Sequence, residues 1–253
     1  MVVVPEGVRG PSDSQIRAAV RAALELSSPR DLIVDEMPLA DRRAFMDVAV
    51  IGATLRGFEI KSDRDGLGRL ARQAQWYGRS FDEVTLVAAR RHLSAAATIA
   101  PAWWGLTAAD AGADGAAVLT PLRAPRENPF VDPLQLLNLL SAWELRRVLR
   151  ENELSAGSSR FDKYAMMHLL LERFPTSAIH RAVMLTLRYR STWTSRTLGT
   201  GEREAEVWLS AQPEPDVRRD VCSMWCENAT FNAVVELPAF RAPVAMSSNS
   251  ASP

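Results

Sequence analysis

The chain has 253 residues, of which 47% are hydrophobic and 24% charged, as in an ordinary globular protein of one or two domains. Its formal net charge is +0, so overall charge gives no argument for a nucleic-acid partner, although a local basic surface can still bind one. No apolar run is long enough to cross a bilayer and the first residues lack the pattern of a signal peptide, so we expect a cytoplasmic protein without membrane association.

The first half of the chain alternates helix and strand patterns. A tight turn at 52–54 predicts an antiparallel hairpin, and a helix that Ser62 or Asp63 caps leads to a strand parallel to the one before it. In chain order we expect a helix at 14–28, strands at 31–37, 43–52 and 55–61, a helix at 63–78, a strand at 81–89, a helix at 92–101 and short edge strands at 103–106 and 116–122.

The second half of the chain is mainly helical. A segment rich in proline and charge at 123–133 indicates a domain boundary, so we expect one domain at 1–125 and a helical one at 126–245, followed by a disordered tail at 246–253. The expected helices are at 133–152, 161–174 and 177–190. The cysteines Cys222 and Cys226 have no second pair to complete a zinc site.

Strand periodicity places two charged side chains together. Glu59 and Lys61 are two residues apart, so both project from one face of their strand. Asp47 interrupts an apolar run on the paired strand, which is costly unless the carboxylate is paired or binds a cation. If the hairpin brings Asp47 beside Glu59, two carboxylates form a site suited to Mg²⁺ or Mn²⁺. The alternative is a surface ion pair of Glu59 with Lys61 and a partly exposed Asp47.

These residues resemble the signature of the PD-(D/E)XK nuclease superfamily, except that Met46 stands where a proline often precedes the first acid. Gln73 and Tyr77, one helical turn apart, resemble the pair of the RecB-like branch. The segments EMPLADRRAFMDVAV and FEIKSDRD resemble MmcB-like DNA-repair proteins, and the stretch through PAWWGL is most similar to the uncharacterised bacterial "sce" family of nuclease-like proteins. The resemblance implies a restriction-endonuclease-like mixed sheet flanked by helices.

The resemblance also implies roles for these residues. Asp47, Glu59 and the backbone carbonyl of Ile60 would hold a divalent ion. Lys61 would orient a water or offset charge on the phosphoryl oxygens, and Gln73 and Tyr77 would position the water or the nucleic-acid backbone. A fourth acid is usual in such sites, and the sequence offers either Glu36 or Glu25.

Five basic residues are candidates for binding nucleic acid. The segment 134–174 loosely resembles SAP-like helix–loop–helix modules, and its alternative is an ordinary helical hairpin that packs on the core or forms a dimer. For Arg42, Arg43 and Arg72, which precede this segment, a solvated surface is an equally good interpretation. The candidates are Arg42, Arg43, Arg72, Arg160 and Lys163. The aromatic pair Trp103 and Trp104 and the three histidines are expected to serve packing and structure.

Taken together, the sequence predicts a Mg²⁺-dependent endonuclease or exonuclease that cleaves DNA in repair or in phage defence. The first alternative is a nuclease fold without activity that binds DNA or a protein. The second is a helical scaffold that recruits a partner, or a homodimer formed through the C-terminal helices.

Overall fold

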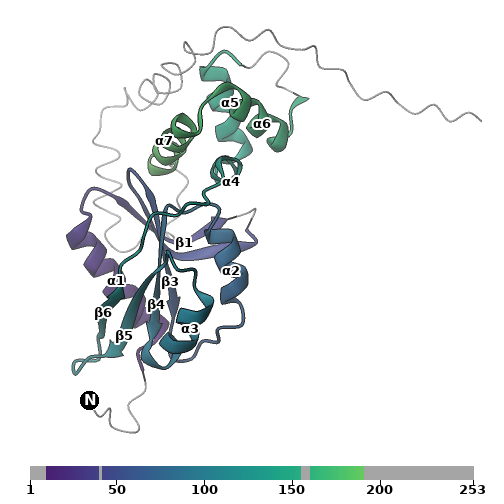
Figure 1. Cartoon of the computed structure of the whole chain (residues 1–253). Coiled ribbons are helices and arrows are strands. Elements are labelled where there is room, and N and C mark those ends of the chain that lie inside the picture. The colour runs from purple at the N-terminus through teal and green to yellow at the C-terminus, as the bar shows by residue number, and fades with distance from the viewer. Residues whose placement is uncertain (1–9, 40–41, 155–159, 191–253) are drawn as a thin grey trace, which may run out of the picture.

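The computed structural model describes residues 10–39, 42–154 and 160–190 and has an α/β architecture (Figure 1). A mixed six-stranded sheet is flanked by helices, and a helical region follows it, which confirms the expected fold class. The elements are α1 (Asp13–Ser27), β1 (Leu32–Leu39), β2 (Ala44–Ile51), β3 (Leu55–Lys61), α2 (Leu70–Tyr77), β4 (Glu83–Ala89), η1 (Arg90–His92), α3 (Leu93–Ile99), β5 (Gly105–Ala111), β6 (Ala117–Arg123), α4 (Pro133–Asn138), α5 (Ala142–Glu151), α6 (Lys163–Arg173) and α7 (Thr176–Arg188).

The strands lie in the sheet in their chain order. β1, β2 and β3 form an antiparallel meander, β4 pairs parallel to β3, β5 pairs parallel to β4, and β6 returns antiparallel. The predicted hairpin and parallel strand are thus confirmed. The prediction of an edge strand at 103–106 was wrong, because β5 begins at Gly105 and lies inside the sheet, between β4 and β6.

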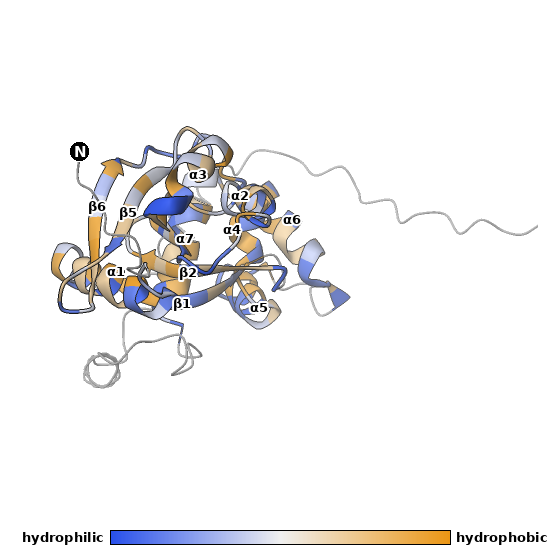
Figure 2. Cartoon of the chain, turned by 90° about the horizontal axis from the view of Figure 1, so that it is seen from below, coloured by the Kyte–Doolittle hydropathy of each residue, from blue (hydrophilic) through white to orange (hydrophobic). Residues whose placement is uncertain are grey.

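Two apolar clusters cover the two faces of the sheet. Helix α1 packs Ile16, Val20 and Leu24 against one face, and its mixture of both colours in Figure 2 is typical of an amphipathic helix. The other face packs against α2 and α3 and continues without a break into the apolar side chains of α4 to α7. Figure 1 shows these last four helices gathered beyond one end of the sheet.

Two predicted helices have different bounds in the structure. Neither Ser62 nor Asp63 caps α2, because the Asp65 carboxylate accepts the Ser62 N–H at 2.8 Å and its hydroxyl at 2.6 Å, which closes a turn before Gly66 and Gly68. The helix expected at 133–152 is divided in two, because Ser141 begins α5 with a capping box.

Some expectations concern residues outside the described ranges. The tail at 246–253, Cys222 and Cys226 all lie there. Among the helices that are described, none combines the length and the apolar character needed to cross a membrane.

Candidate functional site

Strand β3 directs Glu59 and Lys61 into the protein interior on one face, as their spacing predicts. Glu59 is 0% exposed and Lys61 is 4% exposed, so this is a buried ion pair and not a surface one. Lys61 Nζ donates a hydrogen bond to Glu59 Oε1. Removing two charges from water is costly, and the mutual attraction of these groups offsets part of that cost.

Helix α2 contributes two polar side chains, Gln73 and Tyr77, that contact the Glu59–Lys61 pair. The Tyr77 hydroxyl lies 2.7 Å from Glu59 Oε2 and 2.6 Å from the Phe45 carbonyl oxygen, and both can accept its proton. Gln73 donates its amide N–H to the Tyr77 oxygen at 3.2 Å and accepts from Lys61 Nζ at 3.3 Å. Burial, and then the nearby charge of Glu59, raise the pKa of Tyr77, so the phenol stays protonated. Gln73 and Tyr77 lie one helical turn apart, as predicted, and form hydrogen bonds with Lys61 and Glu59, respectively.

Asp47 lies where β2 departs from regular alternation. Met46 and Ala49 both pack on the α2 face of the sheet, although their separation of three would place them on opposite faces of a regular strand. The paired register of β2 and β3 ends at Val48 and Phe58, and beyond it Asp47 Oδ2 accepts the Ile60 N–H at 2.7 Å. The side chain, 26% exposed, thus takes the place of a backbone acceptor.

Burial and nearby charges shift the pKa of the Asp47 carboxylate. Its burial and the charge of Glu59 raise its pKa to about 7, although the Ile60 N–H and the charges of Arg17 and Lys61 act in the opposite direction. A divalent cation bound beside Asp47 would offset the negative charge of Glu59 that disfavours ionisation of Asp47.

Two residues that the sequence did not single out complete this polar region. Arg17, on α1, has Nη2 at 3.6 Å from Asp47 Oδ1 and donates to the Asp47 carbonyl oxygen. It also lies 3.9 Å from Asp35, which Arg21 contacts at 3.1 Å. The signal available in the sequence was Asp35 itself, which with Glu36 interrupts an otherwise apolar strand. The contact with Arg17 depends on how α1 packs on the sheet.

The two candidates for a fourth acid are on different elements: Glu25 lies on α1, and Glu36 lies on β1 between Asp35 and Met37, which pair with the neighbours of Asp47. Glu36 is exposed on β1 with φ of 50°, a left-handed conformation that is rare for residues other than glycine. Glu25 is exposed on α1 and lies 4.0 Å from Arg21. Neither is brought into hydrogen-bond or ion-pair contact with Asp47 or Glu59 in the described part of the chain.

The five basic candidates divide into two groups. Lys163 lies at the start of α6 and donates to the carbonyl of Asn138, the last residue of α4, at 2.9 Å, so its amine already serves a helix end. The Arg42 guanidinium lies 5.3 Å from the centre of the Phe45 ring. The exposed members of the set are Arg42, Arg43, Arg72 and Arg160.

The donor atoms of Asp47 and Glu59 are oxygens, the kind of ligand that magnesium prefers. No group of three or more His, Cys, Asp or Glu side chains that could hold a metal occurs within the described residues, so two carboxylates and the Ile60 carbonyl would be the protein ligands. Mg²⁺ commonly uses one or two carboxylates and keeps several waters. Both Glu59 oxygens are engaged, by Lys61 and Tyr77, but a carboxylate oxygen has a second lone pair for a cation.

Comparisons with known proteins place the chain in a family. Protein cII of Enterobacteria phage P4 is 40% identical to it over 62 residues, which make up 24% of this chain and 24% of that relative. The matched segment thus spans about a quarter of the relative's length. No solved structure matches the chain at a significant level. The model of the family described as bacteriophage P4 protein cII matches residues 12–208. Because this match covers most of the sequence, the chain belongs to the bacteriophage P4 protein cII family.

Proposed function

We propose that the protein is a Mg²⁺-dependent nuclease that cleaves phosphodiester bonds of DNA. The observation that carries the proposal is that an amine and a phenol both bond the buried Glu59 carboxylate, the Gln73 amide links that amine to that phenol, and the charge of Glu59 acts on Asp47. Acids whose pKa is shifted this far by burial and by a neighbouring charge, as that of Asp47 is, are concentrated at functional sites.

In this proposal the side chains have separate roles. Asp47, Glu59 and the Ile60 carbonyl would hold the ion, which when bound supplies Lewis-acid polarisation of the phosphate and a more acidic water. Lys61 places a positive charge where negative charge develops on the phosphoryl oxygens. Gln73 holds the Lys61 amine in position, and Tyr77 fixes the rotamer of Glu59 through its hydroxyl.

The experiment is a nicking assay on supercoiled plasmid and on labelled oligonucleotides, with Mg²⁺ or Mn²⁺. We expect Asp47→Asn and Lys61→Met to lower the cleavage rate at least a hundredfold, because each removes a charge that acts on the transition state. The matched control is Asp114→Asn, an exposed acid in the turn between β5 and β6. Thermal unfolding of each variant separates lost catalysis from lost folding. Metal-dependent cleavage that persists in both folded variants would refute the assignment.

A second function has one observation in its favour. Both oxygens of Glu59 already have partners within the protein, and the residue is fully buried, as in a polar network that only supports the fold. The fold would then bind DNA or a protein without cutting. Tight DNA binding with no cleavage of single-stranded, double-stranded or branched substrates would favour this function.

A further inference from the structure

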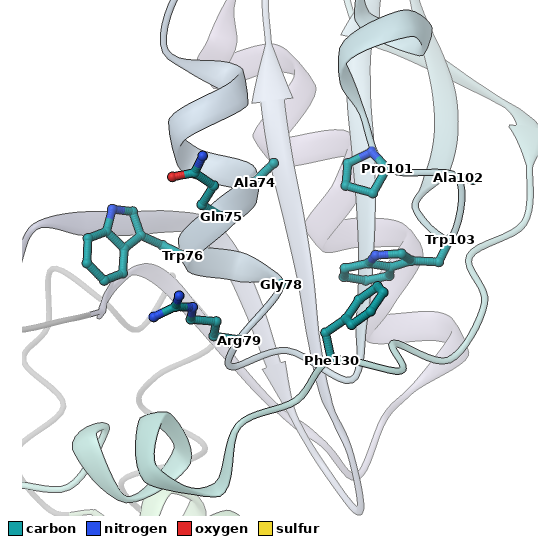
Figure 3. A pocket seen from close by; sticks show the side chains of 9 residues that line it. All are labelled: Ala74, Gln75, Trp76, Gly78, Arg79, Pro101, Ala102, Trp103 and Phe130. Carbon is teal, nitrogen blue, oxygen red and sulfur yellow. The ribbon is translucent and has the colours of Figure 1, made fainter.

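A pocket unrelated to the charged cluster opens beside the outer face of α2 (Figure 3). Its volume is about 570 Å³, within the roughly 300–1,000 Å³ typical of ligand pockets. In Figure 3 the rings of Trp103 and Phe130 lie on one side of it, and α2 with Trp76 and Arg79 lies on the other. Residues from three separate parts of the chain thus line one opening, at which the rings of Trp103 and Phe130 lie side by side.

The connector between β6 and α4, residues 124–132, is fixed beside this pocket by polar contacts. Asn128, which is 5% exposed, donates to the carbonyl oxygens of Gly78 at 2.9 Å and Phe81 at 2.7 Å, and accepts the Phe130 N–H at 3.0 Å. The Asp132 N–H bonds the Arg79 carbonyl at 2.9 Å. Phe130 is therefore fixed beside α2 with 67% of its surface exposed. A large exposed apolar ring whose backbone is fixed by hydrogen bonds, next to the Trp103 ring, is a feature of binding surfaces.

Charge around the pocket indicates what kind of ligand it takes. On α2 and its flanks, Arg69, Arg72 and Arg79 recur at spacings of three and seven residues, so they share the outer face with Trp76. Arg126 lies in the connector, and its backbone N–H bonds the Trp103 carbonyl at 2.8 Å. In the described part of the chain, none of these four guanidinium groups is within ion-pair distance of an acid. A ligand with a flat ring and negative charge would satisfy both the aromatic lining and these cations.

We propose that this pocket binds an unpaired nucleobase, stacked against Phe130 and Trp103, while Arg79 and Arg72 contact the adjoining phosphates. Stacking on aromatic rings with basic residues along the backbone is how proteins hold single strands with little sequence preference. The inference rests on the proposed function for the choice of nucleic acid, and it deepens it by naming the substrate class, which is DNA with a single-stranded segment.

The experiment measures binding of the full chain by fluorescence anisotropy in EDTA, so that cleavage plays no part. The probes are labelled dT15, an abasic 15-mer with the same phosphates, and a blunt duplex. We expect dT15 to bind at least tenfold more tightly than either of the others. Phe130→Ala should weaken dT15 binding about tenfold, which is the effect of losing one stacking contact, and should leave binding of the abasic strand unchanged. Phe130→Trp should retain the affinity for dT15 because it keeps an aromatic ring. Arg79→Gln should weaken both single strands equally.

The controls are Trp143→Ala and Arg150→Gln on α5, an exposed aromatic and an exposed arginine away from the pocket, which should leave the preference for dT15 unchanged. Equal binding of dT15 and the abasic strand, no binding of either, or no effect of Phe130→Ala would overturn the inference and leave the pocket to a protein ligand. Base-dependent binding without any cleavage would refute only the nuclease proposal. Cleavage without base-dependent binding would refute only the inference drawn from the pocket.

Discussion

At the scale of single residues, Glu59 and Asp47 are two acids on neighbouring strands that meet different surroundings. Glu59 lies between an amine and a phenol and is fully buried. Asp47 accepts one backbone N–H and faces Arg17, yet its burial and its proximity to Glu59 raise its pKa to about 7. The pair therefore provides one acid that is firmly held and another whose charge depends on pH near neutrality.

This difference predicts how stability depends on pH in the metal-free protein. The folded state binds the Asp47 proton more tightly than the unfolded state, whose pKa stays near its usual 3.8. The contribution of Asp47 to the free energy of unfolding should therefore be greatest below about pH 4 and fall as pH rises to 7, by up to roughly 4 kcal/mol at about 1.4 kcal/mol per pKa unit. Asp47→Asn should remove that part of the slope in urea denaturation with EDTA. An unchanged slope, equal to that of Asp114→Asn, would contradict the raised pKa.

At the scale of elements, β1 and β2 share an irregularity at the edge of the site. Val34 and Met37 on β1 pack on the same face, as Met46 and Ala49 do on β2. The register pairs Asp35 with Val48 and Met37 with Met46, and Glu36 between them has a positive φ. The irregularity is what frees the Asp47 side chain from regular alternation and lets it reach the Ile60 N–H.

The strained residue in β1 supplies the element-scale prediction. Because Glu36 has φ of 50°, Glu36→Gly should stabilise the protein by about 1 kcal/mol, whereas Glu36→Ala keeps the strain and should give no gain. Denaturation with urea measures both variants. If Glu36 is the fourth acid of the site, both variants should also lose cleavage. Equal stability of the glycine and alanine variants would show that the conformation costs nothing here.

At the scale of the whole molecule, one apolar core joins the sheet to the C-terminal helices. Side chains of β1, β2 and β4 belong to the same buried cluster as those of α4 to α7. A polar contact reinforces this junction, since His180 Nε2 on α7 lies 2.9 Å from both Asp82 oxygens and Asp82 accepts the Leu55 N–H at 2.6 Å. The domain boundary near residue 125 stays a prediction, and the buried cluster contains residues on both sides of it.

A continuous core predicts that the described parts unfold together. In native-state hydrogen exchange, the amides of Leu86 on β4 and Leu187 on α7 should open with the same free energy, because both lie in the shared cluster. A shortened chain ending at residue 125 should be insoluble or lose fixed tertiary structure, since it would expose the face that α4 to α7 cover. Distinct opening free energies for the two amides, with a stably folded fragment, would instead indicate two independent domains.

Sequence reasoning succeeded where the spacing of a few neighbouring residues decides the structure. The period of two placed Glu59 and Lys61 on one face, and the helical turn placed Gln73 with Tyr77. It failed where side chains compete with the backbone. Asp65 closes a turn that delays α2, and Ser141 begins a new helix inside an apolar run. Residue types that form caps and turns do so only where the local geometry permits, and one sequence does not reveal that geometry.

What the sequence determined by itself is the succession of helices and strands along the chain as far as β4 and the presence of one acid and one amine on the same face of β3, because both follow from local periodicity. Only the tertiary structure decided that Arg17 lies between Asp35 and Asp47, that Glu36 has a left-handed backbone, and that Phe130 faces α2 across a pocket. These arrangements join residues far apart in the chain, and they depend on how helices pack on the sheet and where the strands lose their alternation.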